Sequence, residues 1–111
     1  MNRNYKLFLK DINDSILYIE NYLRGISKEV FKEDVGIQDK VIRRAEIIGE
    51  ATKNLPKSLK EKNPSIPWKT MKDLREVIVH YYYEMSLDSV WIFCKEELPL
   101  IKEKLKKIKL V

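Results

Sequence analysis

A chain of 111 residues is long enough for one domain with a buried core and too short for two. With 44% hydrophobic and 35% charged residues, it has the composition of a folded globular protein rather than of a disordered one. No apolar run approaches the roughly 18 residues that span a bilayer, and the N-terminal MNRNYKLFLKDIND lacks the apolar core of a secretory signal. We therefore expect a single cytoplasmic domain over residues 1–111, with no membrane segment.

The formal net charge of +5 is concentrated near the C-terminus. Residues 95–111 contain six lysines and three glutamates, so most of the positive excess lies in this short segment. A basic helix face of this kind is usually solvated surface, but it can also guide a nucleic-acid backbone. Both interpretations stay open, because the charge alone does not predict nucleic-acid binding.

In the first part of the chain, hydrophobic residues recur every three or four positions, which is the pattern of an amphipathic helix. They are Phe8, Ile12, Ile16, Ile19 and Leu23. Gly25 then favours a helix end, because glycine adopts the left-handed conformation without strain. Ser27 can cap a short helical turn that reaches Lys32, and Asp34 can cap a second long helix.

The second long helix is expected to end at Pro56 and to present one apolar face. That face consists of Ile37, Val41, Ala45, Ile48, Ala51 or Thr52, and Leu55. The stretch from Pro56 to Pro67 contains three prolines, so we predict a short helical turn within a connection. Pro67 suits the first position of a third long helix, WKTMKDLREVIVHYYYEM.

A last helix is predicted from about Leu87 to Lys109, with Ser86 as its cap. Pro99 falls inside this helix and predicts a kink, because proline removes an internal hydrogen bond. The chain has only three glycines and almost no β-type alternation. Four long amphipathic helices therefore predict an all-α fold, an antiparallel up-and-down bundle with a short extra helical turn.

Several kinds of functional site are excluded by the residue types present. The single histidine, His80, and the single cysteine, Cys94, are too few for a His/Cys metal centre or an internal disulfide. The chain has no glycine-rich phosphate loop and no nucleophile elbow. Neighbouring carboxylates such as Glu96 and Glu97 diverge on a helix, so they do not flank one bond. We expect neither a metal nor a cofactor.

The remaining candidates lie in LREVIVHYYYEM. Arg75 and Tyr82 fall on nearly the same face of an α-helix, whereas His80 is rotated by about 140° from Arg75. One straight helix therefore does not direct Arg75 and His80 at the same group. Either the helix loosens near residues 81–83, or a second copy of the chain completes the site.

Two glutamates, Glu76 and Glu84, each lie one helical turn from His80, and either can orient its imidazole. From composition alone, however, His80 is more simply explained as an ordinary structural residue. Tyr82 is likewise explained as an amphipathic tyrosine with a buried ring and a solvated hydroxyl.

The spacing Arg-x4-His-x-Tyr, here Arg75, His80 and Tyr82, resembles the motif of the HepT proteins of the HEPN superfamily. The flanking sequence is also similar: IPW at 66–68 and the Leu-Arg pair at 74–75, then SLDSVW at 86–91 and ELP at 97–99. The resemblance extends from the first helix to the last and is strongest over residues 66–99. One position departs from the pattern, since the family usually has Asn or Asp where this chain has Glu76.

This resemblance implies a HEPN-like domain that acts as a metal-independent endoribonuclease toxin, with a composite site between the two chains of a homodimer. It implies that His80 transfers protons during attack of the ribose 2′-hydroxyl on the adjacent phosphate, and that Arg75 binds that phosphate. Cleavage needs both a base and an acid, and a dimer supplies the imidazole twice. The resemblance also implies an MNT-type nucleotidyltransferase antitoxin that transfers AMP to Tyr82, which adds negative charge beside Arg75.

Two other functions fit the same residues. In the first, the chain is a non-catalytic nucleotide- or RNA-binding HEPN module, in which Arg75 and His80 hold a phosphate without cleaving the RNA. In the second, it is a structural partner of a nucleotidyltransferase. We expect the tyrosines at 81–83 to pack at the dimer interface rather than to stack on bases, and Trp68 and Trp91 to lie in the core or an interface.

Overall fold

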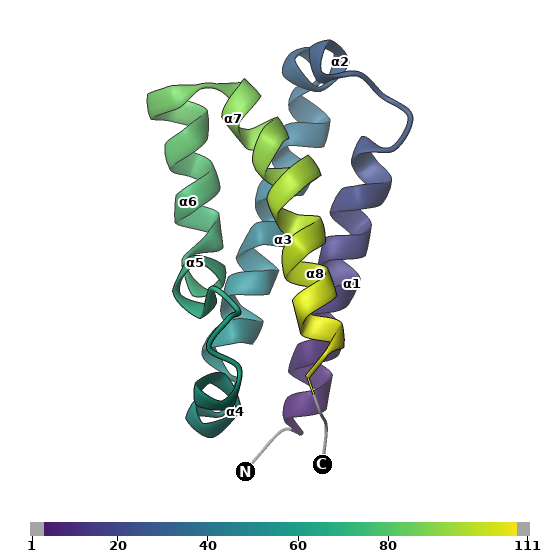
Figure 1. Cartoon of the computed structure of the whole chain (residues 1–111). Coiled ribbons are helices and arrows are strands. Elements are labelled where there is room, and N and C mark those ends of the chain that lie inside the picture. Colours follow the sequence, from purple (N-terminus) through teal and green to yellow (C-terminus); the bar gives the residue numbers. More distant parts are fainter. Residues whose placement is uncertain (1–3, 109–111) are drawn as a thin grey trace.

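The computed structural model describes residues 4–108, which form an antiparallel helical bundle (Figure 1). The elements, in chain order, are α1 (Tyr5–Leu23), α2 (Lys28–Glu33), α3 (Val35–Lys53), α4 (Lys57–Lys62), α5 (Trp68–Lys72), α6 (Leu74–His80), the π-helical turn η1 (Tyr81–Met85), α7 (Leu87–Ile92), the π-helical turn η2 (Phe93–Glu97) and α8 (Leu98–Lys106). No β-strand occurs in the described range. The predicted all-α bundle with a short extra helical turn, α4, is confirmed.

Most helix boundaries lie where the capping residues predict them. Ser27, Asp34 and Ser86 each accept a hydrogen bond from the backbone N–H three residues later, at 3.1, 3.0 and 3.2 Å. Gly25 follows the end of α1 with a φ of 78°, the left-handed conformation that glycine tolerates. These local signals are sufficient to place the beginnings of α2, α3 and α7.

The helices form four arms: α1, α3, the segment α5–α6–η1, and the segment α7–η2–α8. The inner faces of these arms form the core. Its most deeply buried aliphatic side chains include Ile12, Ile16, Ile19, Val41, Ile48, Leu74, Ile78 and Leu98. α1 packs along α3, and α3 contacts α5 and α6. Because full burial of such a side chain contributes roughly 1.5–3 kcal/mol, the predicted apolar stripes stabilise the bundle. Phe8 lies at the edge of this core and is only half-buried.

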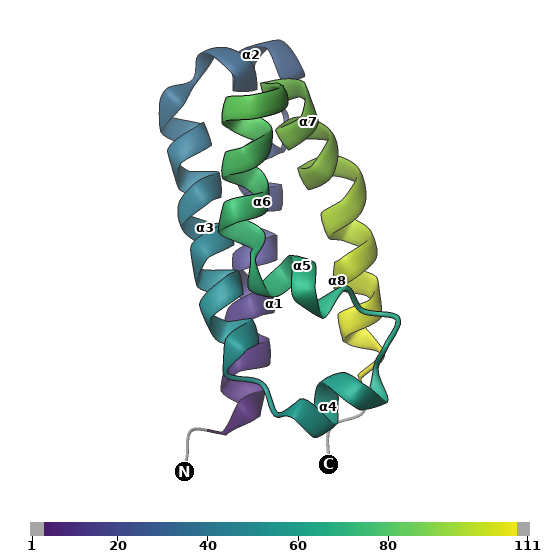
Figure 2. The same cartoon turned by 90° about the vertical axis from the view of Figure 1, so that its left-hand side faces the viewer.

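The third arm is interrupted, in contrast to the single long helix predicted from Pro67. α5 ends at Lys72, Asp73 leaves the helical conformation with φ −99° and ψ 22°, and α6 begins in a new direction at Leu74 (Figure 2). Pro67 precedes the first helical residue instead of occupying that position. Asp73 is a poor helix former, and its carboxylate pairs with Lys69 at 3.2 Å.

Tertiary contacts explain why the interruption is stable. The carbonyl oxygen of Lys72 closely approaches α3 at Gly49, where a Cβ atom would lie only 2.7 Å from it. The indole N–H of Trp68 donates to the backbone oxygens of Lys60 and Asn63 at 3.1 and 2.9 Å, which holds α4 against the start of α5. Trp68 is thus half-buried with a structural role, as expected.

The fourth arm contains a wide turn immediately before Pro99. In an α-helix, a proline clashes with the carbonyl four residues earlier, and that residue, Lys95, lies inside η2. The wider π-helical turn gives room for the ring, so the irregularity predicted at Pro99 takes this form. Trp91 packs on Phe31 with a ring distance of 5.6 Å. The last helix ends at Lys106, with Lys107 as its C-terminal cap, rather than at the predicted Lys109.

Candidate active site

Arg75 lies in the first turn of α6 with an exposed side chain. It borders a concavity of about 290 Å³ between α6, α5 and α3. The other lining residues are Glu46, Gly49, Glu50, Lys53, Lys72 and Glu76. The two glutamates of α3 pair with cations of their own helix, Glu46 with Arg43 at 2.7 Å and Glu50 with Lys53 at 3.1 Å. In the described part of the chain Arg75 has no hydrogen bond or ion pair, so its guanidinium is available for an anion.

His80 is the last residue of α6, and its side chain is 54% exposed. Its Nδ1 atom lies 2.8 Å from Oε2 of Glu84. A carboxylate accepts hydrogen bonds, so this contact favours the ring form with the proton on Nδ1 and leaves Nε2 as the nitrogen that can accept a proton. Of the two glutamates expected near His80, Glu84 makes the contact, whereas Glu76 lines the concavity beside Arg75.

The helix does loosen near residues 81–83, the first of the two alternatives that the sequence left open, in the π-helical turn η1. This turn begins only after His80, so the spacing from Arg75 to His80 remains α-helical. The two side chains are therefore separated by about 140° of rotation and by about 7.5 Å along the axis. Loosening does not bring Arg75 and His80 together within one chain.

The three consecutive tyrosines differ in their surroundings. Tyr81 packs against Phe93, with a distance of 6.2 Å between ring centroids. Tyr82 is half-buried and makes an edge-to-face contact with Tyr83 at 4.8 Å. Tyr83 itself is 77% exposed. Tyr81 and Tyr82 therefore both pack against the core, and Tyr83 lies at the surface against the edge of Tyr82.

The outer side of α6 is uncovered in the described residues. α6 packs on α3 through Leu74 and Ile78, and its opposite side faces the viewer in Figure 2. The half-buried Val79 and the exposed Glu76 point between the directions of Arg75 and His80, at about 40° and 100° from Arg75. Tyr83 and Met85, farther along in η1, are exposed apolar side chains.

Other reactive groups do not add to this site. Burial raises the pKa of the Cys94 thiol to about 12, so the thiol is neutral near pH 7 and is a poor nucleophile. Among residues 4–108, no three His, Cys, Asp or Glu side chains are grouped so that they could hold a metal ion. No helix in that range is both long and apolar enough to cross a membrane.

A family model described as "Ribonuclease HepT-like" matches residues 12–108. The chain belongs to the HepT-like ribonuclease family. A Thermococcus cleftensis relative named "Probable ribonuclease HepT" is 39% identical over 98% of this chain and 99% of its own length. A Methanocaldococcus jannaschii relative, named as a gamma-glutamylcyclotransferase and candidate RNase, is also 39% identical, over 97% of this chain. This HepT-like chain spans about half of that relative, 49% of its length. No solved structure matches the chain.

The HepT-like fold surrounds Arg75 with residues that the sequence analysis did not single out. Lys72, Glu46 and Glu50 share the concavity with Arg75, but lysines and glutamates on exposed helix faces carry no distinctive sequence signal. Gly49 does carry one. A glycine inside a helical pattern indicates a close approach of another backbone, and here that backbone belongs to α5.

Proposed function

We propose that this HepT-like protein is a metal-independent endoribonuclease toxin that cleaves RNA at a composite site between two copies of the chain. One observation carries the proposal. Arg75 and His80 are both exposed on α6, and they point about 140° apart. A monomer therefore has both groups but directs them at different places.

A two-fold axis resolves this separation. The direction midway between Arg75 and His80 points away from the buried Leu74 and Ile78, toward the side that carries Val79 and Glu76. If two α6 helices pack antiparallel along this side, the two-fold axis reverses both the position of a side chain along the helix axis and its position across the contact face. Arg75 of one copy then lies opposite His80 of the second copy, and the reverse pair forms beside it. The exposed Tyr83 and Met85 would be covered in the same contact.

In this arrangement, Nε2 of one His80 takes the proton of the ribose 2′-hydroxyl. The 2′ oxygen bonds to the adjacent phosphorus, and the bond from phosphorus to the 5′ oxygen breaks. The departing 5′ oxygen takes a proton from the His80 imidazolium of the second copy, so that a 2′,3′-cyclic phosphate and a 5′-hydroxyl are formed. Arg75 offsets the charge that develops on the non-bridging oxygens, and Glu84 orients the imidazole through Nδ1.

The regulatory part of the proposal is transfer of AMP to Tyr82 by an MNT-type nucleotidyltransferase antitoxin. Tyr82 is half-buried in η1, two helical turns beyond Arg75. An adenylate on its hydroxyl adds a phosphodiester charge near the uncompensated guanidinium and competes with the RNA phosphate. The cytoplasmic location stays a prediction from the sequence.

Cleavage is tested with purified protein and labelled single-stranded RNA, with and without EDTA. We expect the wild type to cut in both conditions, and His80→Ala and Arg75→Ala to lose at least about a hundredfold in rate. Arg24→Ala is the matched control, because it removes another exposed arginine at the end of α1. If wild type, His80→Ala and Arg75→Ala all bind RNA and none cleaves it, the chain is a binding module and the enzymatic proposal is wrong.

Transfer of AMP is tested by co-expression with an MNT-type nucleotidyltransferase encoded by an adjacent gene, followed by mass analysis of the peptides. We expect one or more AMP units on the peptide containing residues 81–83, present in Tyr83→Phe and absent in Tyr82→Phe. This pair is informative because Tyr83 is the more exposed of the two rings. Loss of the adduct in Tyr83→Phe, with its retention in Tyr82→Phe, would contradict the assignment.

A further inference from the structure

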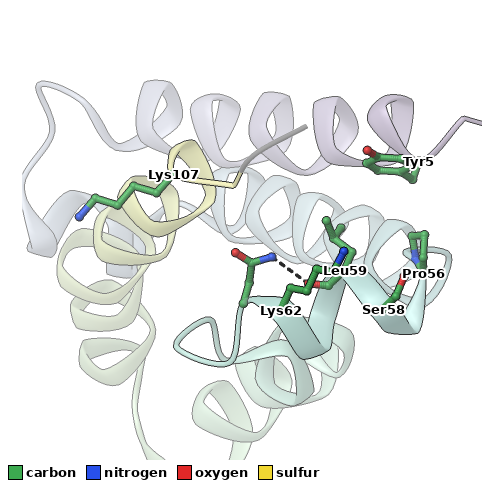
Figure 3. A pocket seen from close by; sticks show the side chains of 7 residues that line it. Tyr5, Pro56, Ser58, Leu59, Lys62 and Lys107 are labelled. Atoms are coloured by element: carbon green, nitrogen blue, oxygen red, sulfur yellow. Dashed lines mark hydrogen bonds between the residues drawn. The ribbon is translucent and has the colours of Figure 1, made fainter. Parts of the chain in front are cut away.

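A second concavity, of about 710 Å³, lies at the end of the bundle where α4 and the end of α8 meet (Figure 3). Lys62 of α4 and Lys107, which follows α8, are both among its lining residues, and the Lys107 side chain extends outward from it (Figure 3). Both side chains are exposed, and neither forms an ion pair within the described residues. Lys104 of α8 reaches toward the same region, because its Nζ donates to the backbone oxygen of Ser65 at 3.0 Å.

Two more lysines continue from α4 toward α6. The Trp68 indole binds the backbone oxygen of Lys60, which ties α4 to the helix that ends with Lys72. The pKa of Lys60 is lowered by its partial burial and by the nearby positive charge of Lys72. Lys72 in turn lines the concavity that contains Arg75. One concavity thus joins Lys107 to Lys62 and another joins Lys72 to Arg75, while the half-buried Lys60, on the same helix as Lys62, lies near Lys72.

These four lysines, which we call the lysine track, are set apart by their positions along α4 and α5 toward Arg75. Several other lysines of this chain are paired, for example Lys10 with Asp14, Lys32 with Asp88 and Lys53 with Glu50. Within residues 4–108 none of the four track lysines has such a partner. A series of uncompensated positive charges is the complement of a phosphate backbone, since each neutralised phosphate releases condensed counterions.

We propose that the lysine track binds the phosphate backbone of single-stranded RNA and leads it along α4 and α5 to Arg75. The inference rests on the proposed function for the chemistry at the end of the track, but RNA binding does not require cleavage. The track accounts for the affinity for RNA and for the path of the RNA strand beyond the scissile linkage. It does not read bases, because ammonium groups contact phosphates without sequence information.

The test measures binding of a labelled single-stranded RNA of about twenty nucleotides as a function of salt concentration. The His80→Ala background removes cleavage, and Lys62→Gln/Lys72→Gln removes two track charges. The matched control, Lys40→Gln/Lys95→Gln, removes two lysines that lie over the Tyr22 and Trp91 rings and likewise lack carboxylate partners in the described chain. Thermal unfolding monitored by circular dichroism confirms that each variant is folded.

The logarithm of the association constant decreases linearly with the logarithm of the salt concentration. We expect this dependence to be shallower by about 1.4 in the track variant, because each phosphate contact to a single strand contributes about 0.7 to the slope. The control should keep the wild-type slope. Equal slopes in track and control variants, or equal losses in both, would overturn the proposal. If the track variant weakens binding while the wild type never cleaves RNA, the track is supported and the catalytic proposal fails. If the wild type cleaves RNA and the slopes do not differ, the catalytic proposal is supported and the track proposal fails.

Discussion

Replacement of Gly49 by alanine tests the contact that positions the α5–α6 break and with it Arg75. A Cβ at this position would lie 2.7 Å from the carbonyl oxygen of Lys72, whereas ordinary contacts begin at 3.4 Å. The clash is with backbone, so α5 must move away from α3. Overpacking of this kind costs about 1–3 kcal/mol, and alanine regains about 1 kcal/mol of helix propensity.

We therefore expect Gly49→Ala to lower the free energy of unfolding by up to about 2 kcal/mol relative to wild type. Gly36→Ala is the matched control on the same helix, because its Cβ would meet only Oδ1 of Asp34, at 3.2 Å, and a small rotation of this exposed carboxylate relieves the contact while either of its oxygens can cap the Ile37 N–H. The measurement is urea denaturation followed by circular dichroism, with unchanged m-values showing that the unfolding transition is comparable.

The reasoning is refuted if Gly49→Ala proves as stable as Gly36→Ala, since the Lys72 carbonyl would then not constrain α3. A second consequence follows for activity. Because Arg75 lies three residues beyond Lys72 on the displaced segment, Gly49→Ala should reduce RNA cleavage by more than its unfolded fraction explains, while Gly36→Ala should leave cleavage unchanged.

Three further predictions follow from individual contacts. Glu84→Gln removes the charge beside His80 Nδ1, so the cleavage rate should fall by about tenfold, the value of a charge-assisted hydrogen bond; an equal fall in Glu76→Gln would contradict this role. The buried Cys94 thiol, with its pKa of about 12, should resist iodoacetamide at pH 8 in the native protein and react in guanidinium chloride, as mass analysis of the alkylated fraction would show. Lys32, 2.9 Å from Asp88, holds the pKa of that carboxyl below its usual 3.8. The ion pair therefore stabilises the folded protein above pH 3.8, and this stabilisation is lost at lower pH. The denaturation midpoint of Asp88→Asn should change less than that of wild type between pH 7 and pH 3, and an equal change would exclude the ion pair.

Local signals account for most of the fold. Ser27, Asp34 and Ser86 cap helices because their side-chain oxygens satisfy backbone N–H groups that no other residue reaches. The break at Asp73 was not predictable from such signals. The apolar pattern continues on both sides of it, and its cause is the distant packing of Lys72 on Gly49. The loosening after His80 was predicted only as one of two possibilities, since it depends on tertiary contacts such as that of Tyr81 with Phe93.

The candidate site shows the same division. The motif spacing located Arg75 and His80, and the structure finds both exposed on α6. The motif spacing did not distinguish between Glu76 and Glu84, because both lie four residues from His80 along the helix. The structure distinguishes them by what surrounds each one, because Glu76 faces the concavity against α3 and Glu84 contacts the imidazole. Position relative to a neighbouring helix is a tertiary property, and a single helical pattern does not contain it.

The composite site makes a quantitative prediction about mixed dimers. If cleavage uses one His80 as base and the second copy's His80 as acid, a dimer of wild type with His80→Ala lacks one of the two groups. Equimolar chains that are unfolded and refolded together assemble at random. About a quarter of the dimers then carry both imidazoles, so about a quarter of the wild-type activity should remain.

A site contained within each chain gives a different result, because half of the chains are wild type and about half of the activity should survive. The rate should therefore fall as the square of the wild-type fraction for a shared site and linearly for an independent one. His80→Ala removes an exposed side chain and so leaves the packing of α6 on α3 intact. A linear dependence over the full range of mixtures would show that one His80 is enough for each site, and would contradict the mechanism that uses one imidazole as base and the other as acid. The geometry argues otherwise, because about 140° of rotation separates Arg75 from His80 within one helix and a two-fold axis is the simplest operation that removes it.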